Sequence, residues 1–160
     1  MKLLITGLFI ILINITRTAS AISPTPLPAV ALTAANGETI MADQIGKEQN
    51  VLLVLVRRGS PGGEKLLAFL NGLKQPLPAA RLVIIAGGAD DRHLKTLSER
   101  YRNLSHASWC RDTDELLAKG MNLQATPVVL GVRRSSADWS VVGMLDEAKM
   151  EGIFRGWVTP

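Results

Sequence analysis

The segment VLLVLVRRGSPGGEKLLAFL, residues 51–70, decides the fold that this sequence can adopt. Its first six residues are apolar without polar alternation, which is typical of a strand covered on both faces. Ser60 and Pro61 then favour a helix start, because a hydroxyl can cap the first turn and proline needs no N–H there. Residues 64–73 continue as a predicted helix. The segment therefore indicates a buried strand that leads directly into a helix.

The rest of the chain alternates in the same way between apolar runs and helical patterns. Asn36-Gly37 is a strong turn signal, since both residues accept positive φ. Asp112, with Glu115 three residues later, predicts a helix start with a reciprocal cap. Further strands are predicted at 29–33, 38–41, 81–86, 107–110, 126–132 and 139–143, and helices at 90–102, 112–120 and 146–157. This order favours an α/β fold in which a central mixed sheet carries helices on both faces.

The N-terminus predicts an exported protein. Lys2 is followed by an apolar run over residues 3–15 and by the small residues Ala19, Ser20 and Ala21, the layout of a cleavable signal peptide. The run is shorter than the roughly 20 residues that span a bilayer, so an uncleaved anchor is the weaker alternative. We expect a signal peptide at 1–21, one mature domain at 22–160, and a bacterial periplasmic location without a membrane span in the mature protein.

Charge and composition exclude several classes of function. Removing Lys2 and Arg17 from the 18 basic residues leaves 16 against 14 acidic ones, and no basic stripe with interleaved aromatics suggests nucleic-acid binding. Cys110 is the single cysteine, so an intramolecular disulfide is impossible. The two histidines, His93 and His106, do not stand at metal-ligand spacing. No metal and no cofactor is therefore expected.

The strand at 51–56, the helix start at Ser60 and the Thr126-Pro127 dipeptide before a later strand resemble the thioredoxin superfamily. The pattern is most similar to the redoxin subgroup of periplasmic (TlpA-like) thiol-disulfide oxidoreductases. The similarity includes a proline-marked leader at 22–28 and an additional strand-helix element at 107–120. In that superfamily the strand delivers a Cys-x-x-Cys pair to the helix start, and a cis proline lies against the pair. The resemblance implies the fold and a cis Thr126–Pro127 bond, but residues 57–70 contain no cysteine.

The resemblance also places a candidate surface where the missing dithiol would lie. An ordinary cap and turn is the simplest interpretation of the helix start. A cis proline exposes the preceding backbone, to which an extended peptide can add as a strand. The candidate partner-binding residues are Arg57, Arg58, Gly59, Ser60, Pro61, Gly62, Gly63, Thr126 and Pro127.

Three functions stay open, and the first is our prediction. It is a non-catalytic assembly or chaperone-like accessory protein that binds an exported protein or peptide. The second is a thiol-disulfide oxidoreductase that works through Cys110 alone, whose neighbour Arg111 could stabilise a thiolate, with a Cys110-linked dimer as a possible form. Unpaired cysteines are more often buried. The third is a small-anion binder that uses Arg57, Arg58 and the bare amides of the helix start.

Overall fold

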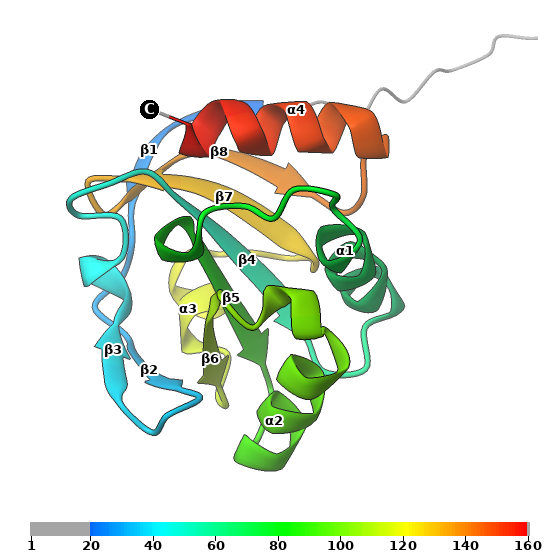
Figure 1. Ribbon diagram of the computed structural model, residues 1–160. Coiled ribbons are helices and arrows are strands. Elements are labelled where there is room, and N and C mark those ends of the chain that lie inside the picture. Colours follow the sequence, from blue (N-terminus) through cyan, green and yellow to red (C-terminus); the bar gives the residue numbers. More distant parts are fainter. Residues whose placement is uncertain (1–19, 160) are drawn as a thin grey trace, which may run out of the picture.

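The computed structural model describes residues 20–159, which form one eight-stranded mixed sheet flanked by helices (Figure 1). The strand order across the sheet is β1-β8-β7-β4-β5-β6-β2-β3. The strands are β1 (Ser20–Pro26), β2 (Ala31–Ala34), β3 (Thr39–Met41), β4 (Val51–Arg57), β5 (Leu82–Gly87), β6 (Ser108–Asp112), β7 (Val128–Arg133) and β8 (Ser136–Val142). The α-helices are α1 (Pro61–Asn71), α2 (Asp91–Arg100), α3 (Leu116–Gly120) and α4 (Glu147–Val158). The predicted α/β fold with a mixed sheet is confirmed.

Strand β4 lies at the centre of the sheet and serves both of its faces. It runs parallel to β5 and antiparallel to β7. Leu52, Val54 and Val56 pack into one apolar core, whereas Leu53 and Leu55 pack into a second core on the opposite face. Burial on both faces explains why this strand has no polar alternation. Because β4 is held in the sheet on both sides, it also positions Arg57, its last residue, and the start of the helix that follows.

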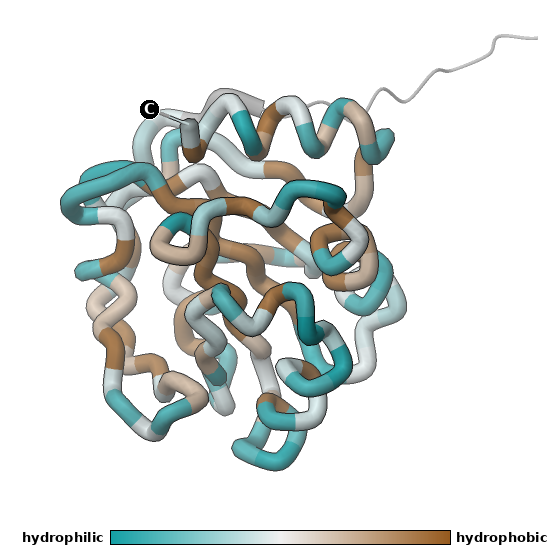
Figure 2. Tube along the Cα trace, in the orientation of Figure 1, coloured by the Kyte–Doolittle hydropathy of each residue, from teal (hydrophilic) through white to brown (hydrophobic). Residues whose placement is uncertain are grey.

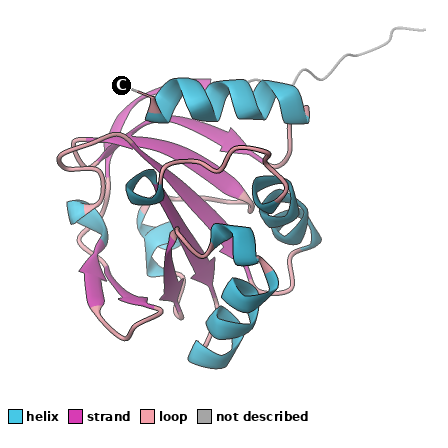
Figure 3. Ribbon diagram, in the orientation of Figure 1, coloured by secondary structure: helices cyan, strands magenta, loops and turns pink. Residues whose placement is uncertain are grey.

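The two faces of the sheet carry different helices (Figure 3). Helices α1, α2 and α4 contribute buried side chains such as Leu66, Leu94 and Phe154 to the first core. Helix α3 contributes Leu117 to the second core, which also contains Leu32 of β2. Figure 2 shows the apolar residues concentrated along the central strands, between these two layers. The prediction of helices on both faces is thus confirmed.

The largest difference from the sequence prediction is at the N-terminal edge. The predicted proline-marked leader forms β1, an edge strand antiparallel to β8. Prolines are tolerated there because an edge strand needs hydrogen bonds on one side only. The predicted signal peptide falls mostly on residues 1–19, outside the described residues, and stays a prediction. Within residues 20–159 no helix is long and apolar enough to cross a membrane.

Candidate functional site

The start of α1 is built as the sequence predicts. The Ser60 hydroxyl accepts a hydrogen bond from the N–H of Gly63 at 3.3 Å, and Pro61 is the first helical residue. Gly59 precedes the cap with φ +72°, a conformation that favours glycine. The ordinary cap and turn is therefore present, and it places the first turn of α1 at the end of β4.

The Pro127 loop lies directly against this helix start, and the Thr126–Pro127 bond is cis. A Cβ atom on Gly62 would lie only 2.9 Å from Pro127 Cδ, so glycine is needed for the two segments to approach this closely. Gly63 is buried, and a Cβ atom there would lie 3.1 Å from Val56 Cβ. The structure thus brings the two separate parts of the predicted surface together.

Thr126 presents an open backbone edge beside Pro127. Among residues 20–159 neither its N–H nor its C=O forms a hydrogen bond. The neighbouring Pro127 carbonyl is used, since it accepts from Gly143 N–H at 2.8 Å. Val142, whose strand partner is Val128, leaves 49% of its surface exposed nearby. The chain therefore offers one free backbone donor and one free acceptor next to an exposed aliphatic side chain.

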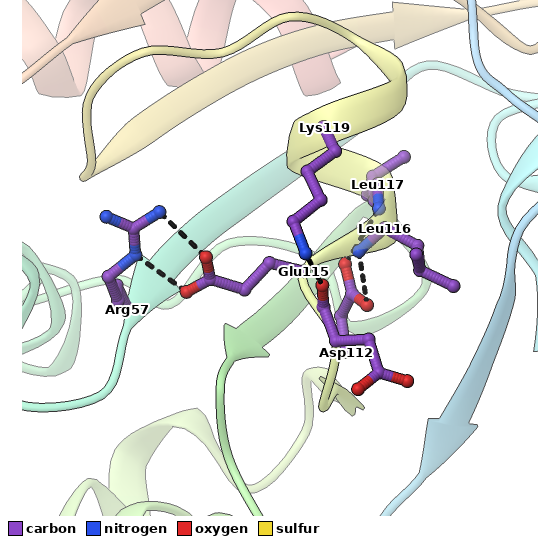
Figure 4. Close-up of polar contacts among 7 residues, drawn as sticks. Arg57, Asp112, Glu115, Leu116, Leu117 and Lys119 are labelled. Carbon is purple, nitrogen blue, oxygen red and sulfur yellow. Dashed lines mark hydrogen bonds and ion pairs between the residues drawn. The ribbon is translucent and has the colours of Figure 1, made fainter.

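Both predicted arginines are paired with carboxylates. Arg57 Nε and Nη2 donate to the two carboxylate oxygens of Glu115 at 2.6 and 2.8 Å (Figure 4). Arg58 Nη1 donates to Asp90 at 3.1 Å. The His93 N–H that donates to Asp90, together with Arg58, holds the pKa of this carboxyl below its usual value. Since each guanidinium already has an anionic partner, the geometry does not favour the anion-site alternative.

Of the reciprocal cap predicted for α3, the part played by Asp112 is present and the part played by Glu115 is wrong. Asp112 is buried, and its carboxylate accepts from the N–H groups of Leu116 and Leu117 at 2.9 and 2.8 Å. Glu115 does not return to the Asp112 N–H, because its side chain is turned toward Arg57 and its backbone is left-handed at φ +55°. Asp112 therefore caps the helix alone. The Arg57–Glu115 pair joins residues that are 58 positions apart in the sequence, so no local sequence pattern predicts it.

Both residues of this ion pair line a small pocket. Its volume is about 10 Å³, at most the room that one water molecule requires. Thr126 forms part of its wall, so the pocket and the free backbone edge are adjacent. The other residues that line it are Leu55, Val56, Arg57, Ile85, Gly87, Asp112, Glu115 and Ala118. Sequence reasoning missed this pocket, since it forms only where four separate segments converge.

Cys110 is not among the residues that line this pocket. It is fully buried in the middle of β6, where its strand partners are Ile85 and Ala34. Burial raises the pKa of its thiol to about 11, so the thiol stays protonated at neutral pH. The structure therefore does not favour the monothiol alternative. Within the described part of the chain, no group of three His, Cys, Asp or Glu side chains could hold a metal ion.

No family model matches the chain, and no curated protein sequence matches it. Its fold does match solved structures. One is a secreted Mycobacterium tuberculosis disulfide oxidoreductase homologous to E. coli DsbE, with 18% identity over 80% of this chain and 96% of that one, and a TM-score of 0.63. The thioredoxin domain of a Bacteroides vulgatus thiol-disulfide oxidoreductase matches with 13% identity over 88% and 100% of the two chains, and a TM-score of 0.63.

StoA from Bacillus subtilis matches with 14% identity over 82% of this chain and 100% of that one, and a TM-score of 0.56. At this level of identity the matches establish the fold. The chain therefore has a thioredoxin-like fold, structurally close to the DsbE-like thiol-disulfide oxidoreductases, and it lacks a dithiol.

Proposed function

We propose that this chain is a periplasmic, non-catalytic accessory protein that binds an extended segment of another exported protein. The docking surface comprises the start of α1, Thr126 and Pro127. The observation that carries the proposal is the free N–H and C=O of Thr126, beside a helix start that has no thiol. An extended peptide can pair with such an edge through its own backbone.

Two further observations support binding rather than redox chemistry. Cys110, the single thiol, is buried and protonated, so it cannot form a mixed disulfide without local unfolding. The serine at the helix start serves as a cap, and among residues 20–159 its hydroxyl forms no hydrogen bond with a basic side chain that could make it a nucleophile. Binding through the backbone of Thr126 requires neither group.

Site-specific photo-crosslinking in the producing cells tests this proposal. A benzoylphenylalanine residue at Val142, beside the free edge, should yield adducts with an exported protein. Met41 is the matched control, because it is also an exposed aliphatic residue, 37% accessible, but lies in β3 at the opposite edge of the sheet. Identical adducts at both positions, or none at Val142, would contradict the proposal.

Redox activity is tested separately with purified full-length protein and its Cys110→Ala variant. We expect neither protein to catalyse disulfide exchange, and we expect the Val142 adducts to persist in the variant. Turnover that disappears in Cys110→Ala would instead establish a monothiol oxidoreductase and overturn the non-catalytic assignment.

A further inference from the structure

We propose that Asn36 is a site of spontaneous chemical modification, at which the folded protein loses a side-chain amide in preference to Asn71. These are the two asparagines of the chain that are followed by glycine. Asn36 lies in the turn between β2 and β3, and Asn71 is the last residue of α1. The inference concerns the turn at Asn36 and is independent of the proposed docking at Thr126.

The reaction needs no enzyme and no cofactor. The backbone nitrogen of the following residue gives up its proton and attacks the side-chain carbonyl carbon of asparagine. A carbon–nitrogen bond forms to the backbone, the bond to the side-chain nitrogen breaks, and ammonia leaves with the proton. Water then opens the cyclic imide at either carbonyl and yields aspartate or isoaspartate. A following glycine permits the attack, because it has no Cβ atom to obstruct it.

Both glycine nitrogens are engaged in the folded protein. Gly37 N–H donates to the Ala34 carbonyl at 2.9 Å. Gly72 N–H donates to the carbonyls of Ala68 and Phe69 at 3.0 and 3.1 Å. A nitrogen whose proton is held in this way does not attack, so each site reacts only after local opening. Since glycine follows both asparagines, the free energy of that opening determines which one reacts first.

Opening at Asn36 breaks few contacts. Within residues 20–159 its side chain is hydrogen-bonded to Glu38 alone, accepting from the N–H at 3.0 Å and donating to Oε2 at 2.8 Å. Residues 35–38 are all exposed, and a Cβ atom on Gly37 would meet nothing within 4 Å. Strand β3, into which the turn leads, has three residues and lies at the edge of the sheet. The turn can therefore open without uncovering a buried side chain.

Opening at Asn71 costs more, because a distant segment and the core both hold it. Its Oδ1 accepts from Asn103 N–H at 3.0 Å, and its carbonyl accepts from Asn103 Nδ2 at 2.8 Å. The end of α1 also carries Leu67 and Leu70, which are 1% and 2% exposed in the first core. Unwinding the end of the helix separates two segments and exposes apolar surface to water. We therefore expect Asn71 to react more slowly than Asn36.

Peptide mapping of the full-length protein tests the inference, with Asn71 as the internal control. The protein is incubated in mildly alkaline buffer with a reductant, and mass spectrometry with chromatographic separation of the two acid products follows both asparagines. In the folded protein Asn36 should react at least about tenfold faster than Asn71, since local opening ranges in cost from almost nothing in turns to the global free energy in core helices. In protein unfolded by guanidinium chloride the two rates should be similar.

Low, non-denaturing concentrations of guanidinium chloride test the role of opening. They should accelerate Asn71 more steeply than Asn36, because the dependence on denaturant scales with the surface that opening exposes. Equal rates in the folded protein, or a faster reaction at Asn71, would overturn the inference. So would an intact Asn36 in the folded protein after a time in which the unfolded chain has reacted fully. A preference for Asn36 that persists in the unfolded chain would also contradict it, because the cause would then be local sequence.

Discussion

At the scale of single residues, Ser60 and Gly63 are separated by a distance that a disulfide can bridge. A Cβ atom built on Gly63 lies 3.6 Å from Ser60 Cβ, within the roughly 3.5–4.5 Å seen across disulfides. We predict that the double variant Ser60→Cys/Gly63→Cys forms this bond under air and gains disulfide-exchange activity. Mass spectrometry before and after alkylation measures the bond, and an insulin-reduction assay measures the activity.

The control for this gain of function is Ser60→Cys alone, which should show no intramolecular bond. A modest loss of stability is expected in the double variant, because the new Cβ would lie 3.1 Å from Val56 Cβ and the helix start must shift slightly. A double variant that folds but keeps two free thiols would show that the helix start has lost the geometry of a redox site, along with its cysteines.

Cys110 gives a second prediction at this scale, on alkaline stability. Its pKa is about 11 in the folded protein against 9.0 for an unperturbed thiol, so the unfolded chain loses the proton first as pH rises. The stability from this group is complete below pH 9 and is lost between about pH 9 and 11. The advantage of the wild type over Cys110→Ala should therefore shrink by about 2 kcal/mol between pH 8 and pH 10.5.

Urea unfolding with a reductant present, at both pH values, measures this difference. Other groups also titrate in this range, and the comparison with Cys110→Ala removes their shared contribution. A difference that does not change with pH would mean that the thiol is hydrated in the folded protein, and it would reopen the question of Cys110 reactivity.

At the scale of elements, α3 depends on one buried carboxylate. The helix has only five residues, and an isolated helix of that length is unstable in water. The carboxylate of Asp112 accepts hydrogen bonds from two N–H groups at the start of this helix. The backbone carbonyl of Asp112 accepts two more, from the N–H groups of Gly88 and Glu115. The start of α3 is thereby attached to the ends of β5 and β6. This attachment positions Glu115 opposite Arg57.

We predict that Asp112→Ala lowers the free energy of unfolding by about 1–3 kcal/mol, the usual cost of losing a cap and leaving buried amides without a partner. Asp112→Asn should cost less, because one acceptor oxygen remains. The control is Asp114→Ala, an exposed residue two positions away, with an expected change within about 0.5 kcal/mol. Urea denaturation measures all three, and equal values for Asp112→Ala and Asp114→Ala would contradict the capping role.

At the scale of the whole molecule, the sequence predicts most of the sheet because its central strands are buried on both faces. The apolar run over residues 51–56 predicts such a buried strand, and Ser60 caps its helix as its local pattern indicates. The Arg57–Glu115 pair and the pocket that it lines could not be predicted, since they depend on contacts between distant segments. The local sequence predicts Glu115 as a reciprocal cap, but in the folded protein its side chain forms an ion pair with Arg57.

The N-terminal edge of the sheet was missed for a related reason. Pro24 and Pro26 weaken any strand signal in the sequence, yet the backbone of β1 pairs with β8 over Ser20–Ser140 at one end and Pro26–Ser136 at the other. Leu27 follows, 4% exposed in the second core, and its N–H donates to the Ser135 carbonyl. The pairs of Thr25 and Pro26 and the contact of Leu27 with the second core lie beyond the predicted cleavage point.

This arrangement predicts how the molecule responds to shortening. A chain that begins at Ile22 keeps the Thr25 and Pro26 pairs and Leu27, so its free energy of unfolding should stay within about 1 kcal/mol of the full chain. A chain that begins at Pro28 loses them and should fall by at least about 2 kcal/mol, the value of one buried leucine. Leu27→Ala in the Ile22 chain separates the two losses, because it removes the core contact and keeps the strand. Equal urea midpoints for the Ile22 and Pro28 chains would show that β1 and Leu27 do not stabilise the rest of the sheet.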